Sequence, residues 1–539
     1  MKKLLAKICA IALVIALAIP GIGASAKTIK VGTTDYTGKT IILHSNDVHG
    51  ALEGYTYIAG LKAYYKSLGA EVIMVDCGDF SQGTTYVSLS KGKNAVTLMN
   101  KAGYDIATLG NHEFDYGWAR LKKNLKKANF KVICADVFKS NGKTIYDPNT
   151  VWTTASGVKI GFFGLETPET QTKVNPGLIQ GISFVQGKEL YEVAQKQVDE
   201  LKEKSDIVIC LAHLGIDAES EAGGNRSIDL YKNTEGIDLI LDGHSHTVMT
   251  EGPEGEPIQS TGTKFAYVGR VIIDDATKKI ESHDLIPVTE FIPVSSKVTK
   301  TALKLEKKVD SKYGAVFAKS EVDLNGDKAP GNRTQETNNG DLITDAILWS
   351  VTKVDNGITV DKDHIVAITN GGGIRAAIKA GDITMKDINT VLPFGNTIAV
   401  VYVKGSELLE ALEASTFCTP NAVGGFPQIS GMKITIDTTK AFDQGDLYPE
   451  STYYAPKSIK RVTIDEINGK AFDKDAVYAV VTNNFCQAGG DTYYVFKNAS
   501  AQFDTGIVMD EAVVEYIQTV LGGVIGSQYA APQGRITVK

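Results

Sequence analysis

The chain has 539 residues, of which 43% are hydrophobic and 22% charged, an ordinary composition for a globular protein. A chain of this length is too long to fold around one ordinary hydrophobic core, so we expect at least two domains. Its 63 acidic and 56 basic side chains give a formal charge of −7, and a net acidic protein has no general attraction for a nucleic-acid backbone. The composition therefore argues against a nucleic-acid polymer as partner and leaves small molecules as the expected ligands.

The first 26 residues predict a secretory signal peptide. Lys2 and Lys3 precede an apolar run from residue 8 to 19, and Ala24-Ser25-Ala26 is a small-residue cleavage pattern. The run is too short to span a membrane, and no apolar tail ends the chain. Removal of residues 1–26 takes away three lysines and no acid, so the mature chain carries a formal charge of −10. We therefore expect a secreted or cell-envelope protein without a stable membrane anchor.

From residue 40 to about 293, short apolar runs alternate with helical patterns. The runs TIILHSND, EVIMVDCGD, DIATLGNH, KVICADVF, KIGFFGLE, DIVICLAHLG and IDLILDGHSH are typical of buried strands, and residues 57–68, 118–128 and 188–204 of helices. Strands interleaved with helices predict a layered α/β domain. Residues 296–314 are charged and favour a helix that joins this first domain, 27–295, to a second domain, 315–539.

Side chains that can bind metal ions gather at the carboxyl ends of these predicted strands, where open α/β sheets place their ligands. The metal-capable residues are Asp47, His49, Asp79, Asn111, His213, His244 and His246. Such a set is too large for one four-coordinate ion and suits two ions that share a carboxylate, for which Asp79 is the natural bridge. Two ions about 3.5–4 Å apart can hold a phosphate and turn a bound water into a hydroxide nucleophile. Nitrogen-rich ligation favours zinc or manganese over magnesium.

His112 and Asp115, in the run NHEFD, are expected to form a separate dyad. A histidine beside a metal-bound amide can donate to a developing oxyanion or leaving oxygen, while a carboxylate three residues on fixes its tautomer. We therefore predict that His112 and Asp115 are catalytic.

The ordered motifs NDVHG, GD, GNHEFD, AHLG and GHSH resemble the calcineurin-type metallophosphoesterase domain, and in particular the exported 5′-nucleotidase family. The resemblance extends into the second half of the chain. It implies a four-layer α/β domain, a β-sandwich flanked by helices, joined by a helix to a second α/β domain that recognises the nucleotide. It also implies two ion sites, one formed by Asp47, His49, Asp79 and His246, the other by Asp79, Asn111, His213 and His244.

Clusters in the second half are weak signals when taken singly, and the resemblance assigns them to a nucleoside pocket. The residues are Arg333 in RTQE, Asn370, Gly372 and Arg375 in TNGGGIR, Phe426 in FPQISG, and Phe485 and Asp491 in FCQAGGD. Phe426 and Phe485 are expected to sandwich the base, since base–aromatic stacking tolerates different bases. Asp491 would accept hydrogen bonds from the ribose, and the two arginines would bind phosphate or ribose oxygens. We expect domain rotation about the 296–314 helix to bring this pocket to the metals.

These features predict an exported hydrolase with two divalent metal ions that releases phosphate from nucleoside 5′-monophosphates by attack of a metal-bound hydroxide. Nucleoside di- and triphosphates and UDP-sugars are further candidate substrates at the same site. One alternative is a 2′,3′-cyclic nucleotide 2′-phosphodiesterase with 3′-nucleotidase activity. An alternative of another class is a non-catalytic nucleotide-binding surface protein. The oligomeric state is left open.

Overall fold

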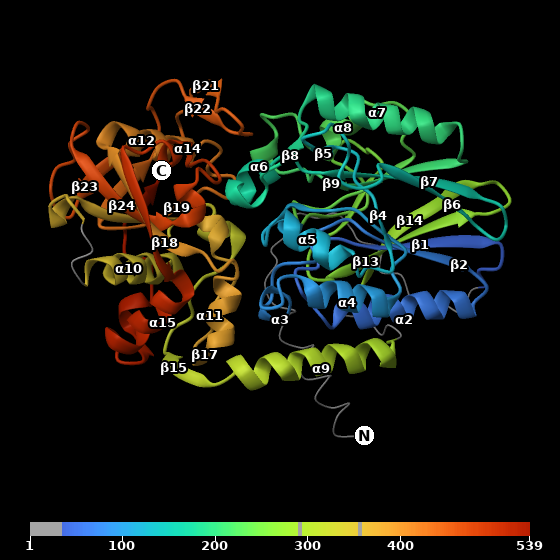
Figure 1. The fold of residues 1–539 in the computed structure, drawn as a ribbon, viewed down its shortest axis with the longest axis horizontal. Coiled ribbons are helices and arrows are strands. Elements are labelled where there is room, and N and C mark those ends of the chain that lie inside the picture. Colours follow the sequence, from blue (N-terminus) through green and yellow to red (C-terminus); the bar gives the residue numbers. More distant parts are fainter. Residues whose placement is uncertain (1–34, 289–293, 354–357) are drawn as a thin grey trace.

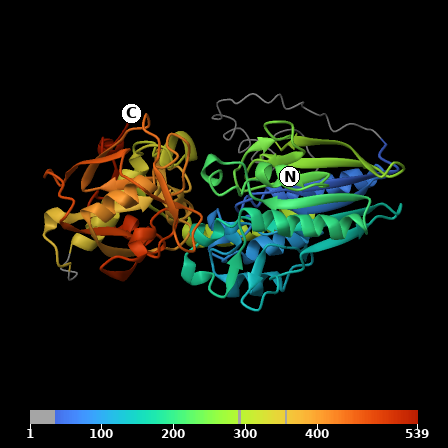
Figure 2. The same ribbon diagram turned by 90° about the horizontal axis from the view of Figure 1, so that it is seen from above.

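The structure, a computed structural model, describes residues 35–288, 294–353 and 358–539, so the predicted signal peptide lies outside the described residues. Two domains lie side by side, and helix α9 (Ser296–Tyr313) runs along the first domain and leads into the second (Figure 1). The view from above shows the same separation into two bodies (Figure 2). None of the described helices is long and apolar enough to cross a membrane.

The first domain is built on two six-stranded sheets, with the orders β14-β13-β1-β2-β3-β4 and β11-β12-β10-β9-β7-β6. The strands of the first sheet are β1 (Lys39–Ser45), β2 (Glu71–Asp76), β3 (Ile106–Ala107), β4 (Lys131–Val132), β13 (Tyr267–Asp274) and β14 (Lys279–Pro287). Those of the second are β6 (Asn149–Thr153), β7 (Lys159–Glu166), β9 (Ile207–His213), β10 (Leu239–Leu241), β11 (Val248–Met249) and β12 (Ile258–Thr261). Strands β1 to β4 run parallel, as do β7, β9, β10 and β12, so their carboxyl ends share one edge of each sheet.

Alternating side chains of the central strands explain why this domain has four layers. In β1, Ile41 and Leu43 pack with helix residues, whereas Ile42 packs against the other sheet. The same alternation occurs in β9, where Cys210 faces helices and Ile209 faces the first sheet. A strand buried on both faces reads as a continuous apolar run. The predicted four-layer α/β architecture is confirmed.

Helices cover the outer face of each sheet. They are α2 (Gly54–Ser67), α3 (Thr85–Ser88), α4 (Lys93–Ala102), α5 (Trp118–Leu125), α6 (Thr170–Lys173), α7 (Lys188–Lys202) and α8 (Ser227–Lys232). Three of them, α2, α5 and α7, have bounds close to the predicted ranges 57–68, 118–128 and 188–204. In α7 the buried residues Leu190, Ala194, Val198 and Leu201 recur at helical spacing, so one face of the helix packs on the second sheet. A small antiparallel pair, β5 (Val137–Lys139) and β8 (Ile182–Phe184), completes the domain.

The second domain has a five-stranded mixed sheet of order β19-β16-β24-β18-β25 between two helical layers. Its strands are β16 (Ile365–Asn370), β18 (Thr397–Lys404), β19 (Pro427–Ser430), β24 (Val477–Asn483) and β25 (Ala501–Val508). Helices α10 (Asn338–Thr352), α11 (Met385–Val391) and α15 (Met509–Thr519) share a core with one face, and α12 (Gly405–Ala414) shares a core with the other.

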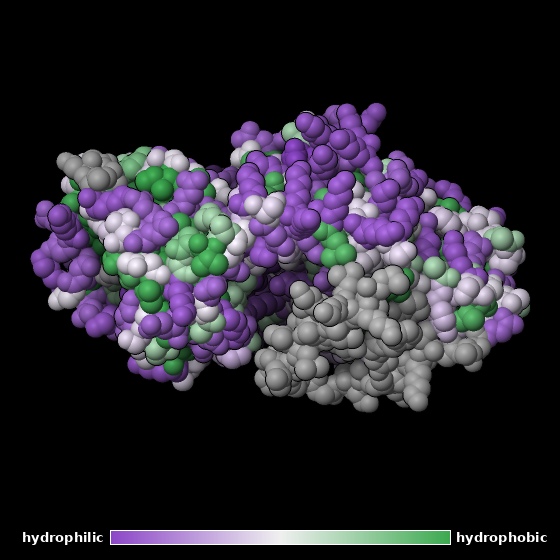
Figure 3. Space-filling model, turned by 90° about the horizontal axis from the view of Figure 1, so that it is seen from below, coloured by the Kyte–Doolittle hydropathy of each residue, from purple (hydrophilic) through white to green (hydrophobic). Residues whose placement is uncertain are grey.

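Shorter elements surround this sheet. They are β15 (Val316–Ser320), β17 (Gly381–Thr384), β20 (Met432–Ile436), β21 (Gln444–Leu447), β22 (Tyr454–Pro456), β23 (Val462–Ile467), β26 (Val524–Ile525), β27 (Ile536–Val538), α13 (Asn484–Gln487) and α14 (Tyr494–Lys497). Seen from the side of α9, the surface is mainly hydrophilic and is hollowed between the two domains (Figure 3).

Candidate functional site

The predicted metal ligands lie at the edge of the first domain that faces the second. Asp47 and His49 follow β1, Asp79 follows β2, Asn111 follows β3, and His244 and His246 follow β10. His213 is the last residue of β9, at the carboxyl end of that strand. Parallel strands of both sheets therefore deliver all seven residues to one place.

Five of these residues have left-handed backbone conformations that side chains other than glycine rarely adopt. Asp47, His49, Asp79, His244 and His246 have φ angles between 44° and 73°. Each such residue costs about 1–3 kcal/mol, and such strain persists where the surrounding structure fixes it, often at functional sites. The shared conformation turns the five side chains toward one another.

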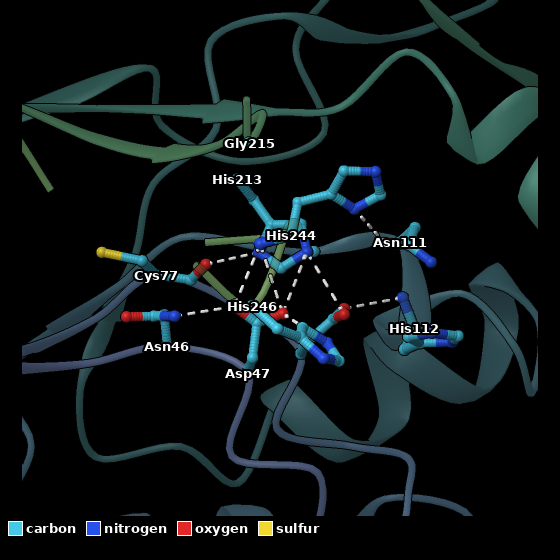
Figure 4. A network of polar contacts seen from close by, with 12 residues as sticks. Asn46, Asp47, Cys77, Asn111, His112, His213, Gly215, His244 and His246 are labelled. Atoms are coloured by element: carbon cyan, nitrogen blue, oxygen red, sulfur yellow. Dashed lines mark hydrogen bonds and ion pairs between the residues drawn. The ribbon is translucent and has the colours of Figure 1, made fainter. Parts of the chain in front are cut away.

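A first cluster is formed by Asp47, His49 and His246. The Nε2 atoms of His49 and His246 are 3.0 Å apart, and Asp47 Oδ1 lies 3.9 Å and 3.4 Å from them respectively. Figure 4 shows that His246 and His213 both lie close to Asp47. Two ring nitrogens and a carboxylate oxygen thus converge on one point, as a bound cation requires.

A second cluster surrounds His213. Its Nδ1 donates to the Cys77 carbonyl at 2.7 Å, which leaves the lone pair on Nε2, 3.2 Å from Asp79 Oδ2. This buried Nε2 has no hydrogen-bond partner in the described part of the chain. Nearby, His244 Nδ1 is 3.0 Å from Asn111 Oδ1. Such an orphaned acceptor, beside a carboxylate and an amide oxygen, fits a metal ion.

Asp79 lies between the two clusters. Its Oδ2 is 3.2 Å from His213 Nε2 and 3.7 Å from His49 Nε2. Asp47 also approaches both clusters, since its Oδ1 is 4.0 Å from His213 Nε2. The arrangement therefore offers shared carboxylates to a pair of cations.

The electrostatics of the site agree with this donor set. Burial raises the pKa of the Asp47 carboxyl, and burial holds the pKa of His49 well below its usual value, which leaves a neutral imidazole able to bind metal. Burial alone would lower the pKa of His213, but Asp79 and Asp47 raise it well above the usual value. The two carboxylates therefore favour positive charge beside them, and a metal ion bound at the Nε2 lone pair of His213 would supply that charge in place of a proton.

Two buried glutamates that the sequence analysis missed hold the ligand loops in place. Glu113 accepts hydrogen bonds from four backbone N–H groups, those of Asp79, Phe80, Ser81 and Gly110. It thereby ties the loop after β2 to the loop after β3. A charged residue inside the otherwise ligand-rich run GNHEFD was the available signal.

The second glutamate is Glu169, which directly precedes α6. Its Oε2 is 3.0 Å from His244 Nε2, so the ring directs Nδ1 toward Asn111. Metal-binding histidines commonly donate their other ring N–H to a carboxylate in this way. No local pattern marks Glu169, because it meets His244 only in the folded chain.

The predicted dyad is present. His112 Nδ1 lies 2.7 Å from Asp115 Oδ2, and the His112 backbone N–H donates to Asp79 Oδ1 at 2.9 Å. Burial raises the pKa of Asp115, and the contact with His112 opposes that shift. His112 Nε2 faces the second domain, 3.4 Å from Arg375 Nη2.

One cavity of about 210 Å³ joins the two domains at this place. From the first domain it is lined by Asp79, Asn111, His112, Asp115, His244 and His246, and from the second by Arg333, Asn370, Gly372, Arg375, Phe485 and Asp491. The structure therefore brings the cavity-lining residues of the two domains together. In this arrangement the domains need no further rotation for these residues to meet.

Phe426 is the exception among the predicted pocket residues. It is fully buried in the core of the second domain, at the start of β19, and does not line the cavity. Phe394 lines the cavity instead, with its ring 5.8 Å from the His112 ring at an interplanar angle of 29°. The expected sandwich of Phe426 and Phe485 is therefore wrong. A usable signal was the run LPFGN, where flanking proline and glycine keep Phe394 out of a strand or helix.

The two cavity arginines lack carboxylate partners. Within residues 35–288, 294–353 and 358–539, neither the Arg333 nor the Arg375 guanidinium has a carboxylate oxygen within 4.0 Å. Burial, together with repulsion from Arg333, lowers the pKa of Arg375 to about 10. A buried, unpaired cation is costly, so this pair of arginines is suited to an anionic ligand.

Comparison with known proteins extends these observations to the whole chain. Residues 40–248 match the family model of the calcineurin-like phosphoesterases, and residues 316–498 match that of the 5′-nucleotidase C-terminal domain. The 5′-nucleotidase of Vibrio cholerae is 29% identical over 94% of this chain and 94% of its own length. The trifunctional nucleotide phosphoesterase protein of Bacillus subtilis is 28% identical over 88% of this chain, which spans only 34% of that protein.

The crystal structure of a 5′-nucleotidase precursor from Thermus thermophilus superposes with a TM-score of 0.75 at 29% identity and covers 93% of this chain and 99% of that one. The agreement therefore includes both domains. Together with the metal-ligand clusters, it shows that the chain belongs to the 5′-nucleotidase family, hydrolases in which a calcineurin-like phosphoesterase domain is followed by a 5′-nucleotidase C-terminal domain.

Proposed function

We propose that this chain is an exported two-metal hydrolase that releases phosphate from nucleoside 5′-monophosphates. The observation that carries the proposal is one cavity lined by members of both ligand clusters together with two unpaired arginines and two aromatic rings. Metal ligands alone would hydrolyse phosphoesters without selecting the alcohol. A cavity that also holds aromatic and cationic groups selects a phosphate attached to a flat base.

In this proposal the first domain, 27–295, supplies the catalytic groups. Asp47, His49 and His246 would hold one ion, Asn111, His213 and His244 the other, and Asp79 would contact both. Two divalent ions, zinc or manganese, would supply a nucleophilic water at neutral pH and neutralise phosphate charge. Asp79 Oδ2 lies 3.7 Å from His49 Nε2 and 3.2 Å from His213 Nε2, which supports its assignment to both proposed ion sites.

His112 is proposed to stabilise the reacting phosphate. Asp115 holds the ring at Nδ1, so Nε2 is the atom directed into the cavity. Arg375 lies 3.4 Å from that atom and can bind the same phosphate oxygens. A hydrogen bond or proton delivered there would reach the oxygen on which negative charge develops.

The second domain, 315–539, would bind the nucleoside. Phe394 and Phe485 are the aromatic residues that line the cavity, and stacking on such rings is worth about 1–3 kcal/mol per base. The Asp491 carboxylate, fixed by the Asn370 amide at 2.8 Å, is suited to accept hydrogen bonds from ribose hydroxyls. The two domains would rotate relative to each other about helix α9, within residues 296–314, during substrate entry and product release.

Substrate profiling of purified residues 27–539 tests the proposal. Phosphate release is measured from AMP, 3′-AMP, 2′,3′-cyclic AMP and UDP-glucose at equal concentrations with Mn²⁺ or Zn²⁺. We expect the highest kcat/KM for AMP. A higher value for the cyclic nucleotide or for 3′-AMP would favour the cyclic phosphodiesterase alternative. Tight AMP binding without release of phosphate would favour a binding protein.

A further inference from the structure

Lys173 is a buried cation that the proposed mechanism leaves without a role. It ends α6 of the first domain, its side chain is 11% exposed, and it lines the cavity. Its Nζ lies 2.6 Å from Glu219 Oε1 and 3.9 Å from both Glu169 Oε2 and Asp491 Oδ1. An ammonium group has three N–H donors, and only the Glu219 contact is within hydrogen-bond distance. Donor capacity therefore remains, and Asp491 is one of two carboxylates that lie just beyond hydrogen-bond distance of it.

Asp491 has a carboxylate oxygen that lacks a hydrogen-bond donor among the described residues. Its Oδ2 accepts from the Asn370 amide at 2.8 Å, and its backbone N–H donates to the Thr172 carbonyl at 2.6 Å. Among the described residues, Oδ1 accepts no hydrogen bond and has only the Lys173 ammonium at 3.9 Å. A donor from the first domain and an acceptor from the second thus stand side by side, too far apart to satisfy each other.

Gly424 keeps the space over this pair open. A Cβ atom at that position would lie 3.0 Å from Lys173 Nζ and 3.1 Å from Asp491 Oδ1. Gly424 also lines the cavity, and its backbone N–H donates to Glu219. Any other residue there would cover the two groups, so the glycine leaves both accessible to a ligand.

We propose that Lys173 determines specificity for the sugar: its ammonium donates to one hydroxyl of a ribose 2′,3′-diol while Asp491 accepts from the other. Neighbouring hydroxyls, each a donor and an acceptor, match an ammonium beside a carboxylate. The inference rests on the proposed function and narrows its substrate class to ribonucleotides over deoxyribonucleotides. A site built to hydrogen-bond a hydroxyl discriminates against the analogue that lacks it.

The position of Lys173 also connects sugar recognition to the metal site. Its helix begins directly after Glu169, which holds His244 at 3.0 Å. The ribose contact from the first domain is therefore placed by the same segment that orients a proposed metal ligand. A bound diol would bridge the domains, because Lys173 and Asp491 belong to different ones.

Steady-state kinetics with four esters tests this role. AMP, 2′-deoxy-AMP, 3′-deoxy-AMP and p-nitrophenyl phosphate are compared for the Mn²⁺-loaded wild type, Lys173→Met and the matched control Lys188→Met, whose side chain is 89% exposed. We expect wild-type kcat/KM for AMP to exceed that for at least one deoxy analogue by about 10- to 100-fold, the size of a charged hydrogen bond. Lys173→Met should lower kcat/KM for AMP by that factor and remove the discrimination against the analogue that lacks the hydroxyl bound by Lys173, whereas Lys188→Met should retain it.

A uniform loss for all four esters in Lys173→Met would make Lys173 a structural ion pair and overturn the proposal, as would unchanged discrimination. If Lys173→Met melts several degrees lower than the wild type, the Lys173→Arg variant is tested in its place, because arginine keeps the charge beside Glu219 but moves the donors. Lys173→Arg should also reduce the discrimination between AMP and the deoxy analogue. A wild type that hydrolyses p-nitrophenyl phosphate but no nucleotide contradicts the proposed function, and the ribose role falls with it. Hydrolysis of AMP with unaltered discrimination in both variants refutes the ribose role alone.

Discussion

Replacing Glu113 by glutamine should loosen the two loops that carry Asp79 and Asn111. Glu113 Oε1 accepts from the Phe80 and Ser81 N–H groups at 3.0 and 2.9 Å, and Oε2 accepts from Asp79 and Gly110 at 2.7 and 2.8 Å. Glutamine keeps one of these oxygens and replaces the other with an NH₂ group that cannot accept. Two buried backbone N–H groups then face a donor.

The magnitude follows from the two lost bonds. A buried N–H group left without an acceptor costs about 1–3 kcal/mol, so the two such groups in Glu113→Gln should reduce the free energy of unfolding of the first domain by about 2–6 kcal/mol. For a domain of this size, 1 kcal/mol corresponds to about 2–4 °C in melting temperature. The variant should melt at least about 4 °C below the wild type.

Differential scanning calorimetry measures this shift, and metal analysis of the same samples shows whether the ligand loops still bind ions. Glu189→Gln is the matched control, because Glu189 is exposed in the first turn of α7. We expect the control to melt with the wild type and Glu113→Gln to lose both stability and metal. Equal melting temperatures and equal metal contents for all three proteins would refute the role assigned to Glu113.

Three further predictions concern the dyad, the base and a buried histidine. His112→Ala should lower kcat for AMP by about 10²–10⁴-fold with unchanged metal content, and loss of metal would contradict its assignment as a catalytic group. Phe394→Ala should raise the KM for AMP by about 5- to 100-fold through lost stacking, and an unaltered KM would refute Phe394 as a base contact. Burial lowers the pKa of His44 to about 4 from 6.5. The unfolded chain therefore binds a proton below pH 6.5 that the folded chain does not, which removes about 3 kcal/mol of stability by pH 4. Urea unfolding of His44→Gln should show a correspondingly weaker loss between pH 6.5 and 4, and parallel curves would contradict this.

The elements that the sequence predicted well are those with a local signal. The alternation of Ile41, Ile42 and Leu43 is visible in the sequence because a strand buried on both faces needs apolar side chains at every position. The candidate metal ligands could be expected to converge because each lies at a strand end in a short polar motif, and parallel strands bring such ends together. The left-handed conformation of Asp79 was not visible, since aspartate carries no signal comparable to that of glycine.

The missed residues act through partners distant in the sequence. Glu169 meets His244 across 75 positions, and Lys173 meets Asp491 from the other domain. No periodicity or motif reports such contacts. Phe426 was misassigned because an aromatic residue at the start of a segment has the same local appearance whether it faces a core or a cavity. The fold shows that Phe394, and not Phe426, lines the cavity, in agreement with the turn-forming proline and glycine that flank it.

Metal titration of stripped protein tests the central claim most directly. Residues 27–539 are freed of metal, Zn²⁺ or Mn²⁺ is added back in increments, and bound metal and phosphate release from AMP are measured on the same samples. We predict that two ions bind per chain and that activity returns fully only as the second site fills. Full activity with one bound ion, or AMP hydrolysis by the metal-free protein, would contradict a two-metal site at Asp79.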